Sequence, residues 1–185
     1  MGIRRLVFTL LARLRSEWAC KVRYRLFPVE FLRENGATIG VDCRFLSNFI
    51  CTEPYLLRIG DHVSIGYGVE LLPHEGAVWV LRGLEKDDNL DRFAPIQIGN
   101  NVFIGNGVKV LPGVVIGDNV VVGANSVVCK KLDSNAVYGG VPAHWICSIE
   151  EFRSKHLHHC ISSKGMSCHQ KRALVEQSTA SAWHK

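Results

Sequence analysis

One histidine stands where a regular pattern of the sequence is interrupted. His74 lies in the run Pro73-His74-Glu75-Gly76, at the start of an interruption that spans residues 73–95. An imidazole with a pKa near neutrality is well suited to take a proton from a hydroxyl or an amine at physiological pH. Because loops on a rigid scaffold commonly bear function, we identify His74 as the candidate general base. The plain alternative is a surface loop histidine.

Several carboxylates accompany this histidine on the interruption. Glu75 is its direct neighbour, and Asp87, Asp88 and Asp91 follow further along the same segment. Two interpretations stay open: one of these carboxylates orients the imidazole or a bound acceptor, or together they form a charged loop face.

The elements that must position these residues follow from a six-residue repeat. From Ile98 an aliphatic residue returns at every sixth position and forms a first column. A second column lies four positions after the first along the chain. Between the columns stand Gly, Asn and Asp, which tolerate tight corners. The first column is Ile98, Ile104, Val110, Ile116, Val122 and Val128, and the second is Val102, Val108, Val114, Val120 and Ser126. Upstream copies are Ile59/Val63, Ile65/Val69, and the weaker Ile39/Cys43 and Phe45/Phe49.

A period of six is neither the 3.6 of a helix nor the 2 of a simple strand. It fits a short strand plus a corner, so that three units close one coil of about 18 residues. Such coils stack at roughly 4.8 Å with the aliphatic columns inside. Because the strands of an ordinary sandwich would not keep this phase, we predict an all-β core, a parallel β-helix over residues 34–147.

Two further runs, together with the repeat and its interruption, resemble a known family. They are Val121–Lys130 (VVGANSVVCK) and Gly139–Ala143 (GGVPA), just past the last coil. Over about residues 36–147 the chain resembles the hexapeptide-repeat acyltransferases, and among them the acetyl-CoA-dependent sugar and polysaccharide O-acetyltransferases. The resemblance implies a left-handed parallel β-helix and a homotrimer. It also implies acetyl-CoA as co-substrate without a permanently bound cofactor, and a groove between two subunits that His74 faces.

The same resemblance assigns the donor-binding positions residue by residue. It places Asn106, just after the Ile-Gly of a middle coil, and the backbone of Ala124 against the donor. It places Lys130 against a CoA phosphate, where a cationic point charge is chemically reasonable, although a solvated coil-edge lysine is the alternative. Many relatives carry Thr before this Lys, whereas this chain has Cys129. We therefore expect phosphate contacts that are weaker or come from Lys131.

The implied activity is transfer of an acetyl group from acetyl-CoA to a sugar hydroxyl, in surface polysaccharide synthesis. Gly68 stands where some relatives carry an acceptor-binding Asn, so the acceptor is left open. The apolar patch Val78-Trp79-Val80 either shapes the acceptor pocket or packs on a neighbouring subunit. Alternatives are N-acylation of an amino sugar, acetylation of serine or an antibiotic, and a non-enzymatic scaffold. A γ-type carbonic anhydrase needs three zinc histidines, whereas the coils offer only His62, which we interpret as structural or solvent-facing, and His74.

The basic charge of the chain lies at its two ends. The net charge is +5, with +6 in residues 1–33, −4 in residues 34–147 and +3 in residues 148–185. An acidic body argues against nucleic-acid binding, which needs a basic face. We predict a helix over residues 2–27, with an apolar face of Leu6, Leu10, Leu14 and Trp18 among arginines. It either caps the first coil or contacts an anionic membrane surface or a partner.

The C-terminal part, residues 148–185, is predicted to be a short helix capped by Ser148 over residues 148–160, followed by a loose tail. The His and Cys residues of the tail match no zinc spacing, so we predict no metal site. Seven cysteines at irregular spacing, without a signal-peptide pattern, predict reduced thiols. No apolar run approaches the roughly 18 residues of a membrane span. We expect a cytoplasmic protein, at the inner face of the membrane if the N-terminal helix binds there.

Overall fold

The structure is a computed structural model that describes residues 7, 8, 10, 17–46 and 51–180. Predicted features at Leu6, Leu14 and Phe49 lie outside these residues. The chain divides into two compact units, residues 1–152 and 153–185, and each is described by itself.

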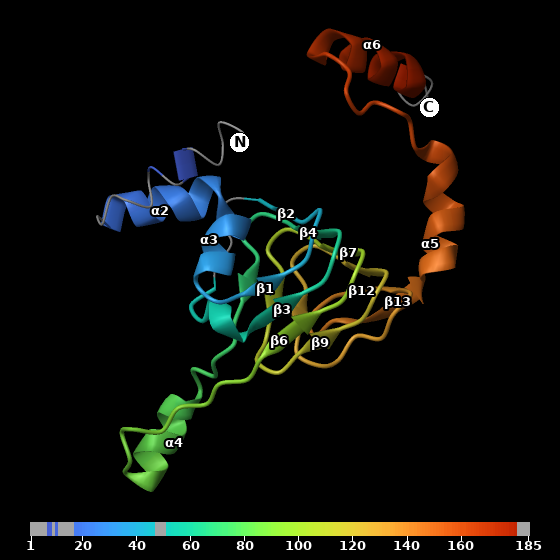
Figure 1. The fold of residues 1–185 in the computed structure, drawn as a ribbon. Helices are drawn as coiled ribbons and strands as arrows, with labels where there is room; N and C mark the ends of the chain where they lie inside the picture. Colours follow the sequence, from blue (N-terminus) through green and yellow to red (C-terminus); the bar gives the residue numbers. More distant parts are fainter. Residues whose placement is uncertain (1–6, 9, 11–16, 47–50, 181–185) are drawn as a thin grey trace. The chain divides into compact units, whose positions relative to one another are not determined.

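Three sheets form the walls of a coil in the first unit (Figure 1). Sheet A contains β1 (Thr38–Ile39), β3 (Leu57–Ile59), β6 (Ile96–Ile98) and β9 (Val115–Ile116). Sheet B contains β2 (Arg44–Phe45), β4 (Val63–Ile65), β7 (Val102–Ile104), β10 (Val120–Val122), β12 (Ala136–Gly139) and β13 (His144–Ser148). Sheet C contains β5 (Glu70–Leu71), β8 (Lys109–Val110) and β11 (Val127–Val128). Because the chain visits A, B and C in turn, the walls meet at three corners, which we call AB, BC and CA.

The strand register confirms the predicted coil. Strands pair in parallel with the strands of the next coil, and Ile98 lies opposite Ile116 at an offset of 18 residues. Ile59 pairs with Ile98 at an offset of 39, so the interruption inserts 21 residues into one coil. Only β13 departs from this pattern among the paired strands, because it turns back and runs antiparallel to β12.

The interior of the coil is built from the two predicted columns. Every member of both columns between Ile98 and Val128 is at most 4% exposed. Ser126 is the polar member, and its hydroxyl donates to the carbonyl of Gly123 (2.7 Å) and accepts from the N–H of Gly140 (3.0 Å). The hexapeptide-repeat β-helix is therefore confirmed, whereas its left-handed sense stays a prediction.

Corner AB is held by a polar ladder in which His62 takes part. The stacked turn residues adopt positive φ angles and are Asp42, His62, Asn101, Asn119 and Asn135. The amide of Asn101 donates to Asn119 (2.8 Å), and that of Asn119 donates to Asn135 (2.8 Å). His62 Nδ1 lies 2.5 Å from a carboxylate oxygen of Asp42. The His62 side chain is also 68% exposed, in line with its interpretation as a structural or solvent-facing residue.

The first coil is capped by a helix that lies beyond the one predicted over residues 2–27. The N-terminal helices are α2 (Glu17–Leu26) and α3 (Pro28–Glu34). Leu32 of α3 is fully buried in the core of the coil. Leu10 and Trp18, two residues of the predicted apolar face, are 52% and 66% exposed. The single predicted helix ends at Leu26 because Pro28, with a fixed φ and no N–H, begins a new one.

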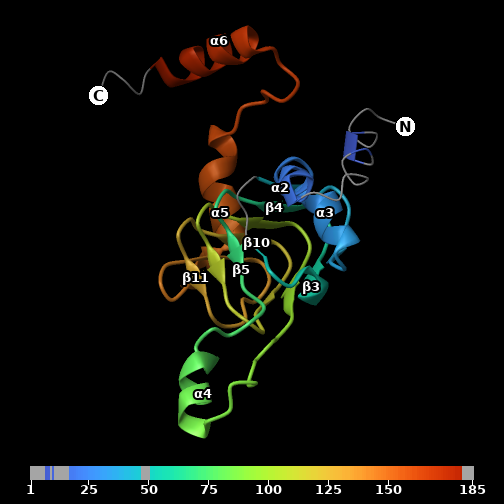
Figure 2. The same cartoon turned by 90° about the vertical axis from the view of Figure 1, so that its left-hand side faces the viewer.

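The interruption is an excursion that leaves the coil at corner CA. It carries the helix α4 (Val78–Glu85), which lies away from the coils in both views (Figures 1 and 2). Val78 is buried, whereas Trp79, Val80 and Leu84 are 61–75% exposed. The short helix η1 (Pro54–Leu56) occupies the same corner one coil earlier.

The C-terminal helix α5 (Ile149–His156) begins as predicted. The hydroxyl of Ser148 accepts from the N–H of Glu151 (3.1 Å), and the Glu151 carboxylate accepts from the N–H of Ser148 (2.7 Å). These bonds hold the pKa of Glu151 below its usual value. No helix in the described part of the chain is long and apolar enough to cross a membrane.

The tail is more regular than expected. After η2 (Leu157–His159), a second helix, α6 (Cys168–Thr179), stands in place of the predicted loose segment. Its first turn is a capping box in which Ser167 and Gln170 bond reciprocally, and Arg172 pairs with Glu176 at 2.7 Å. No α6 side chain is buried, so local bonds and not core packing define this helix.

Candidate active site

The predicted base occupies corner CA, three residues after the end of a strand of sheet C. His74 follows β5 where the chain leaves the coil, and its ring faces the segment that occupies this corner one coil earlier. Nδ1 lies 3.0 Å from Oε2 of Glu53 and 3.2 Å from the hydroxyl of Thr52. The His74 side chain is 40% exposed and that of Glu53 is 16% exposed, so the imidazole reaches solvent while its partner is mostly covered.

These contacts determine which ring nitrogen of His74 is free to accept a proton. A carboxylate oxygen accepts hydrogen bonds and has no proton to give, so Nδ1 of His74 carries the proton and donates it to Glu53. The Thr52 hydroxyl donates to the same carboxylate oxygen. Nε2 is then the unprotonated nitrogen, with the lone pair that a general base needs.

The carboxyl group of Glu53 is held in its ionised form. Burial acts to raise the pKa of Glu53, but hydrogen bonds from Thr52 and His74 and the charge of the imidazole outweigh it. The pKa of Glu53 therefore lies below its usual value. An ionised carboxylate at Nδ1 orients the ring and stabilises the imidazolium that forms when Nε2 takes a proton.

The carboxylates of the excursion contact other groups. Glu75 accepts from the N–H of Ala77 (3.1 Å) and lies 3.8 Å from Arg92. Asp91 pairs with Arg82 at 2.6 Å, and Asp87 accepts from the N–H of Asn89 at 3.0 Å. None of these contacts reaches the imidazole, so the interpretation that a carboxylate of this segment orients His74 is corrected in favour of Glu53.

A signal for Glu53 exists in the sequence, but it lies in the coil register. β1 and β3 pair at an offset of 20 residues, with Ile39 opposite Ile59. Counting back 20 residues from His74 leads to Pro54, which directly follows Thr52 and Glu53. The carboxylate is therefore a neighbour along the stack rather than along the chain, and a search confined to the interruption misses it.

The other predicted site residues lie at two different corners. Asn106 and Ala124 follow β7 and β10 at corner BC, one coil apart, and the Asn106 side-chain oxygen accepts from the N–H of Tyr67 (2.9 Å). Lys130 follows β11 at corner CA, two coils from His74, which is about 10 Å along the stack. Its side chain is exposed, while the neighbouring Lys131 pairs with Asp133 at 2.7 Å. One chain therefore presents the two pairs of predicted site residues at opposite ends of the strands of sheet C.

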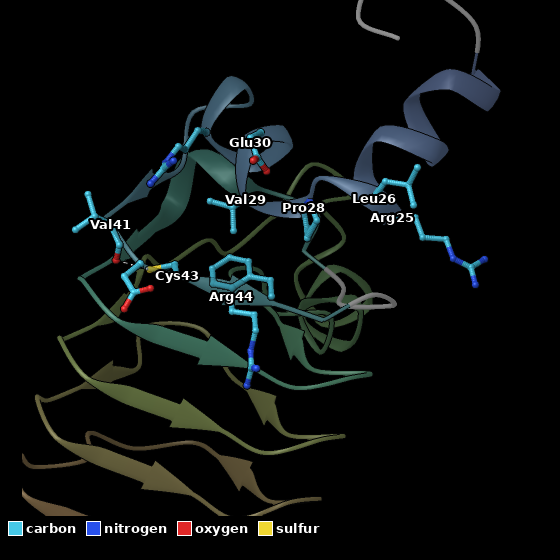
Figure 3. Close-up of a pocket in the computed structure, with 11 residues that line it drawn as sticks. Arg25, Leu26, Pro28, Val29, Glu30, Val41, Cys43 and Arg44 are labelled. Atoms are coloured by element: carbon cyan, nitrogen blue, oxygen red, sulfur yellow. Dashed lines mark hydrogen bonds between the residues drawn. The ribbon is translucent and has the colours of Figure 1, made fainter. Parts of the chain in front are cut away.

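A cavity of about 410 Å³ lies elsewhere, at the N-terminal end of the coil (Figure 3). Residues of α2, α3 and the first coil line it, among them Arg25, Glu30 and Arg44. The four predicted site residues are not part of its lining.

Comparison with known proteins identifies the family. A model described as bacterial transferase hexapeptide (six repeats) matches residues 95–130. Protein CapG of Staphylococcus aureus is 44% identical over 158 residues, covering 84% of this chain and 91% of CapG. The galactoside O-acetyltransferase of Escherichia coli (strain K12) is 40% identical over 137 residues, covering 70% of this chain and 62% of that enzyme. The chain belongs to the hexapeptide-repeat acetyltransferase family.

Solved structures agree with the assignment of this acetyltransferase to the family. A galactoside acetyltransferase in complex with coenzyme A superposes with a TM-score of 0.59 at 29% identity, covering 88% of both chains. A maltose O-acetyltransferase from Clostridium difficile 630 superposes with a TM-score of 0.54 at 30% identity, covering 75% of this chain and 88% of that one. The acetyltransferase thus shares its coil with sugar O-acetyltransferases, and the pair of His74 and Glu53 lies at the corner where the coil is interrupted.

Proposed function

We propose that the protein transfers an acetyl group from acetyl-CoA to a hydroxyl of a sugar acceptor, in surface polysaccharide synthesis, with His74 as general base. The observation that carries the proposal is the 3.0 Å contact between Glu53 and Nδ1 of His74, which leaves Nε2 as the proton acceptor. The names of the relatives, galactoside and maltose O-acetyltransferases, support a sugar as the acceptor.

The chemistry proceeds in two proton transfers at one nitrogen. Nε2 of His74 takes the hydroxyl proton as the acceptor oxygen attacks the thioester carbonyl, and a tetrahedral oxyanion forms. The carbon–sulfur bond then breaks, the acetyl group stays on the acceptor oxygen, and the imidazolium returns its proton to the CoA thiolate. Glu53 stabilises the imidazolium between these two steps.

The donor would be held by corners of two different copies. Asn106 and Ala124 lie at corner BC, and His74 and Lys130 at corner CA. We infer that corner CA of one copy faces corner BC of another, so that acetyl-CoA binds between them in a homotrimer of the 20.6 kDa chain. The solved galactoside acetyltransferase with coenzyme A supports CoA as the ligand of such a site.

Mixing two inactive variants tests the shared site. His74→Ala removes the base from corner CA, and Ala124→Trp blocks corner BC with an exposed bulky side chain. Co-refolding equal amounts should restore about a quarter of the sites, those that pair an intact His74 with an intact Ala124 of another copy. A mixture as inactive as its components, or a wild-type chain that scatters light as a monomer, would contradict the shared site.

The acetyl transfer itself is tested by release of the CoA thiol in the presence of candidate acceptors. We expect release that depends on a pyranoside, with an O-acetylated sugar identified by mass spectrometry. Transfer to serine or to an amino-sugar nitrogen in place of a sugar hydroxyl would overturn the proposed acceptor.

We also propose that α2 contacts an anionic membrane surface. Its outward face combines Trp18 and Leu26, 66% and 54% exposed, with the basic residues Lys21 and Arg25. Aromatic and basic residues together on a helix face favour the lipid interface, and each basic residue contributes about 1 kcal/mol that salt screens. Co-sedimentation should show binding to anionic vesicles that high salt abolishes. Equal failure to bind anionic and neutral vesicles would leave α2 with a structural role alone.

A further inference from the structure

The base of the excursion is a short two-stranded ladder. The N–H of Glu75 donates to the carbonyl of Arg92 (2.9 Å), and the N–H of Ala94 donates to the carbonyl of Pro73 (2.8 Å). Between these two bonds His74 and Phe93 stand directly opposite each other in an antiparallel bridge. Residues flanked in this way form a non-hydrogen-bonded pair, the type in which the side chains of opposite strands lie closest.

This register places a phenyl ring beside the imidazole. Residues directly opposite in an antiparallel ladder project from the same face. The ring centroids of His74 and Phe93 are 6.5 Å apart, with an angle of 65° between the ring planes. Glu53 and Thr52 bind the Nδ1 edge of the imidazole. The reactive Nε2 edge is therefore the one available to an acceptor that also contacts Phe93.

Phe93 is not a core residue. It is 52% exposed and is absent from the cluster that fills the coil. A single exposed phenylalanine needs no explanation by itself. What distinguishes Phe93 is that backbone hydrogen bonds on both sides hold it in register with the candidate base. Trp79 and Leu84 of α4 are more exposed, but they lie on the helix beyond this ladder.

We propose that Phe93 is the platform on which the acceptor sugar ring stacks. One face of a pyranose presents mainly C–H bonds, and such an apolar face packs favourably on an aromatic ring. A hydroxyl at the edge of a ring stacked on Phe93 then lies within hydrogen-bond reach of Nε2 of His74, because the two protein rings are only 6.5 Å apart. The acceptor class is therefore a pyranose, and an acyclic hydroxy compound such as serine gains nothing from this surface. The inference rests on the proposed function and names the acceptor class of the same site.

Kinetics of substitutions at Phe93 test the platform. Phe93→Ala should raise KM for a pyranoside acceptor about tenfold, the usual scale of a contact with an aromatic face. KM for acetyl-CoA and the slow hydrolysis of acetyl-CoA without acceptor should stay within twofold. Phe93→Tyr should retain the acceptor KM, whereas Phe93→Leu should lose it, since leucine keeps the apolar volume but not the flat ring. Phe103→Ala is the matched control, because Phe103 is 44% exposed on sheet B.

A binding measurement separates this inference from the proposed function. Saturation-transfer NMR with methyl glycosides of galactose and glucose and with maltose requires no acetyl transfer. Saturation should reach the C–H protons of one sugar face in the wild-type protein and the Phe103→Ala variant, and be lost in Phe93→Ala. If binding follows this pattern but no acetyl transfer occurs, the proposed function falls and the platform stands. Unchanged binding and acceptor KM in Phe93→Ala, wild-type behaviour of Phe93→Leu, or no pyranoside binding to the wild-type protein would each overturn the platform.

Discussion

Replacing Glu53 by glutamine removes the charge from the partner of the proposed base, His74, while keeping the size of the side chain. The glutamine amide can donate to Nδ1 of His74, which would favour the proton on Nε2 and so disable the base. At the observed 3.0 Å, the attraction between a carboxylate and an imidazolium is about 1.4 kcal/mol in water and about 5.5 kcal/mol at an effective dielectric constant of about 20. Hydrogen bonds to charged groups contribute about 1.5–3 kcal/mol. Since the His74 side chain is 40% exposed, we take the lower part of the electrostatic range, which agrees with the hydrogen-bond figure.

We therefore expect Glu53→Gln to lower kcat about 10- to 100-fold, at 1.4 kcal/mol for each factor of ten. The assay is CoA-thiol release at saturating acetyl-CoA and acceptor, with KM for acetyl-CoA expected to stay within twofold. Glu75→Gln is the matched control, because Glu75 adjoins His74 in sequence but binds Ala77. A kcat for Glu53→Gln within twofold of wild type, or an equal loss in Glu75→Gln, would refute the assignment of Glu53 as the positioning residue.

The same carboxylate makes stability depend on pH. Because the pKa of Glu53 is lowered in the folded protein, its contribution to the free energy of unfolding is present above the ordinary carboxyl pKa of about 4.3. That contribution is lost as the pH falls through the lower folded value. Denaturant titrations of wild type and Glu53→Gln should therefore differ most above pH 5 and converge in acid.

Three further outcomes follow from the structure. Lys130→Ala should raise KM for acetyl-CoA with little change in kcat, because it removes a ground-state phosphate contact; an unchanged KM would mark Lys130 as a solvated coil-edge residue. Burial raises the pKa of Cys51 to about 12. Iodoacetamide at pH 8 should therefore label Cys51 roughly a thousandfold more slowly than the exposed Cys20. Labelling of the two cysteines at equal rates would contradict the burial of Cys51. Gly105→Ala should cost about 1–3 kcal/mol of unfolding free energy, since its methyl group would lie 2.6 Å from a backbone nitrogen of the next coil. Gly76→Ala, which meets no atom within 4 Å, should be near neutral in the same denaturation series.

The coil could be predicted because its determinants repeat. Ile98 and Ile116 are separated by one coil in the sequence and stack in the structure, so a single period fixes strand, corner and core together. His74 could be found because it stands where that period breaks. Its partner could not be found in the interruption, because Glu53 reaches the imidazole across the stack.

The helices outside the coil were harder to place for a different reason. Pro28 divides the N-terminal segment into two helices, and the apolar residue that caps the coil is Leu32, beyond the predicted stripe. α6 lacks a buried face, so hydrophobic periodicity gives no signal for it. Its capping box at Ser167 and Gln170 was the available signal, and it is a short local pattern rather than a repeated one.

The most direct test of the account is the turnover of His74→Ala with a pyranoside acceptor. We predict that kcat falls by about 10²–10⁴, the usual contribution of a general base. KM for acetyl-CoA, the oligomeric state and the melting temperature should match those of the wild-type protein. A variant that folds and assembles normally and keeps its turnover within a few-fold of wild type would contradict the assignment of His74 as the base.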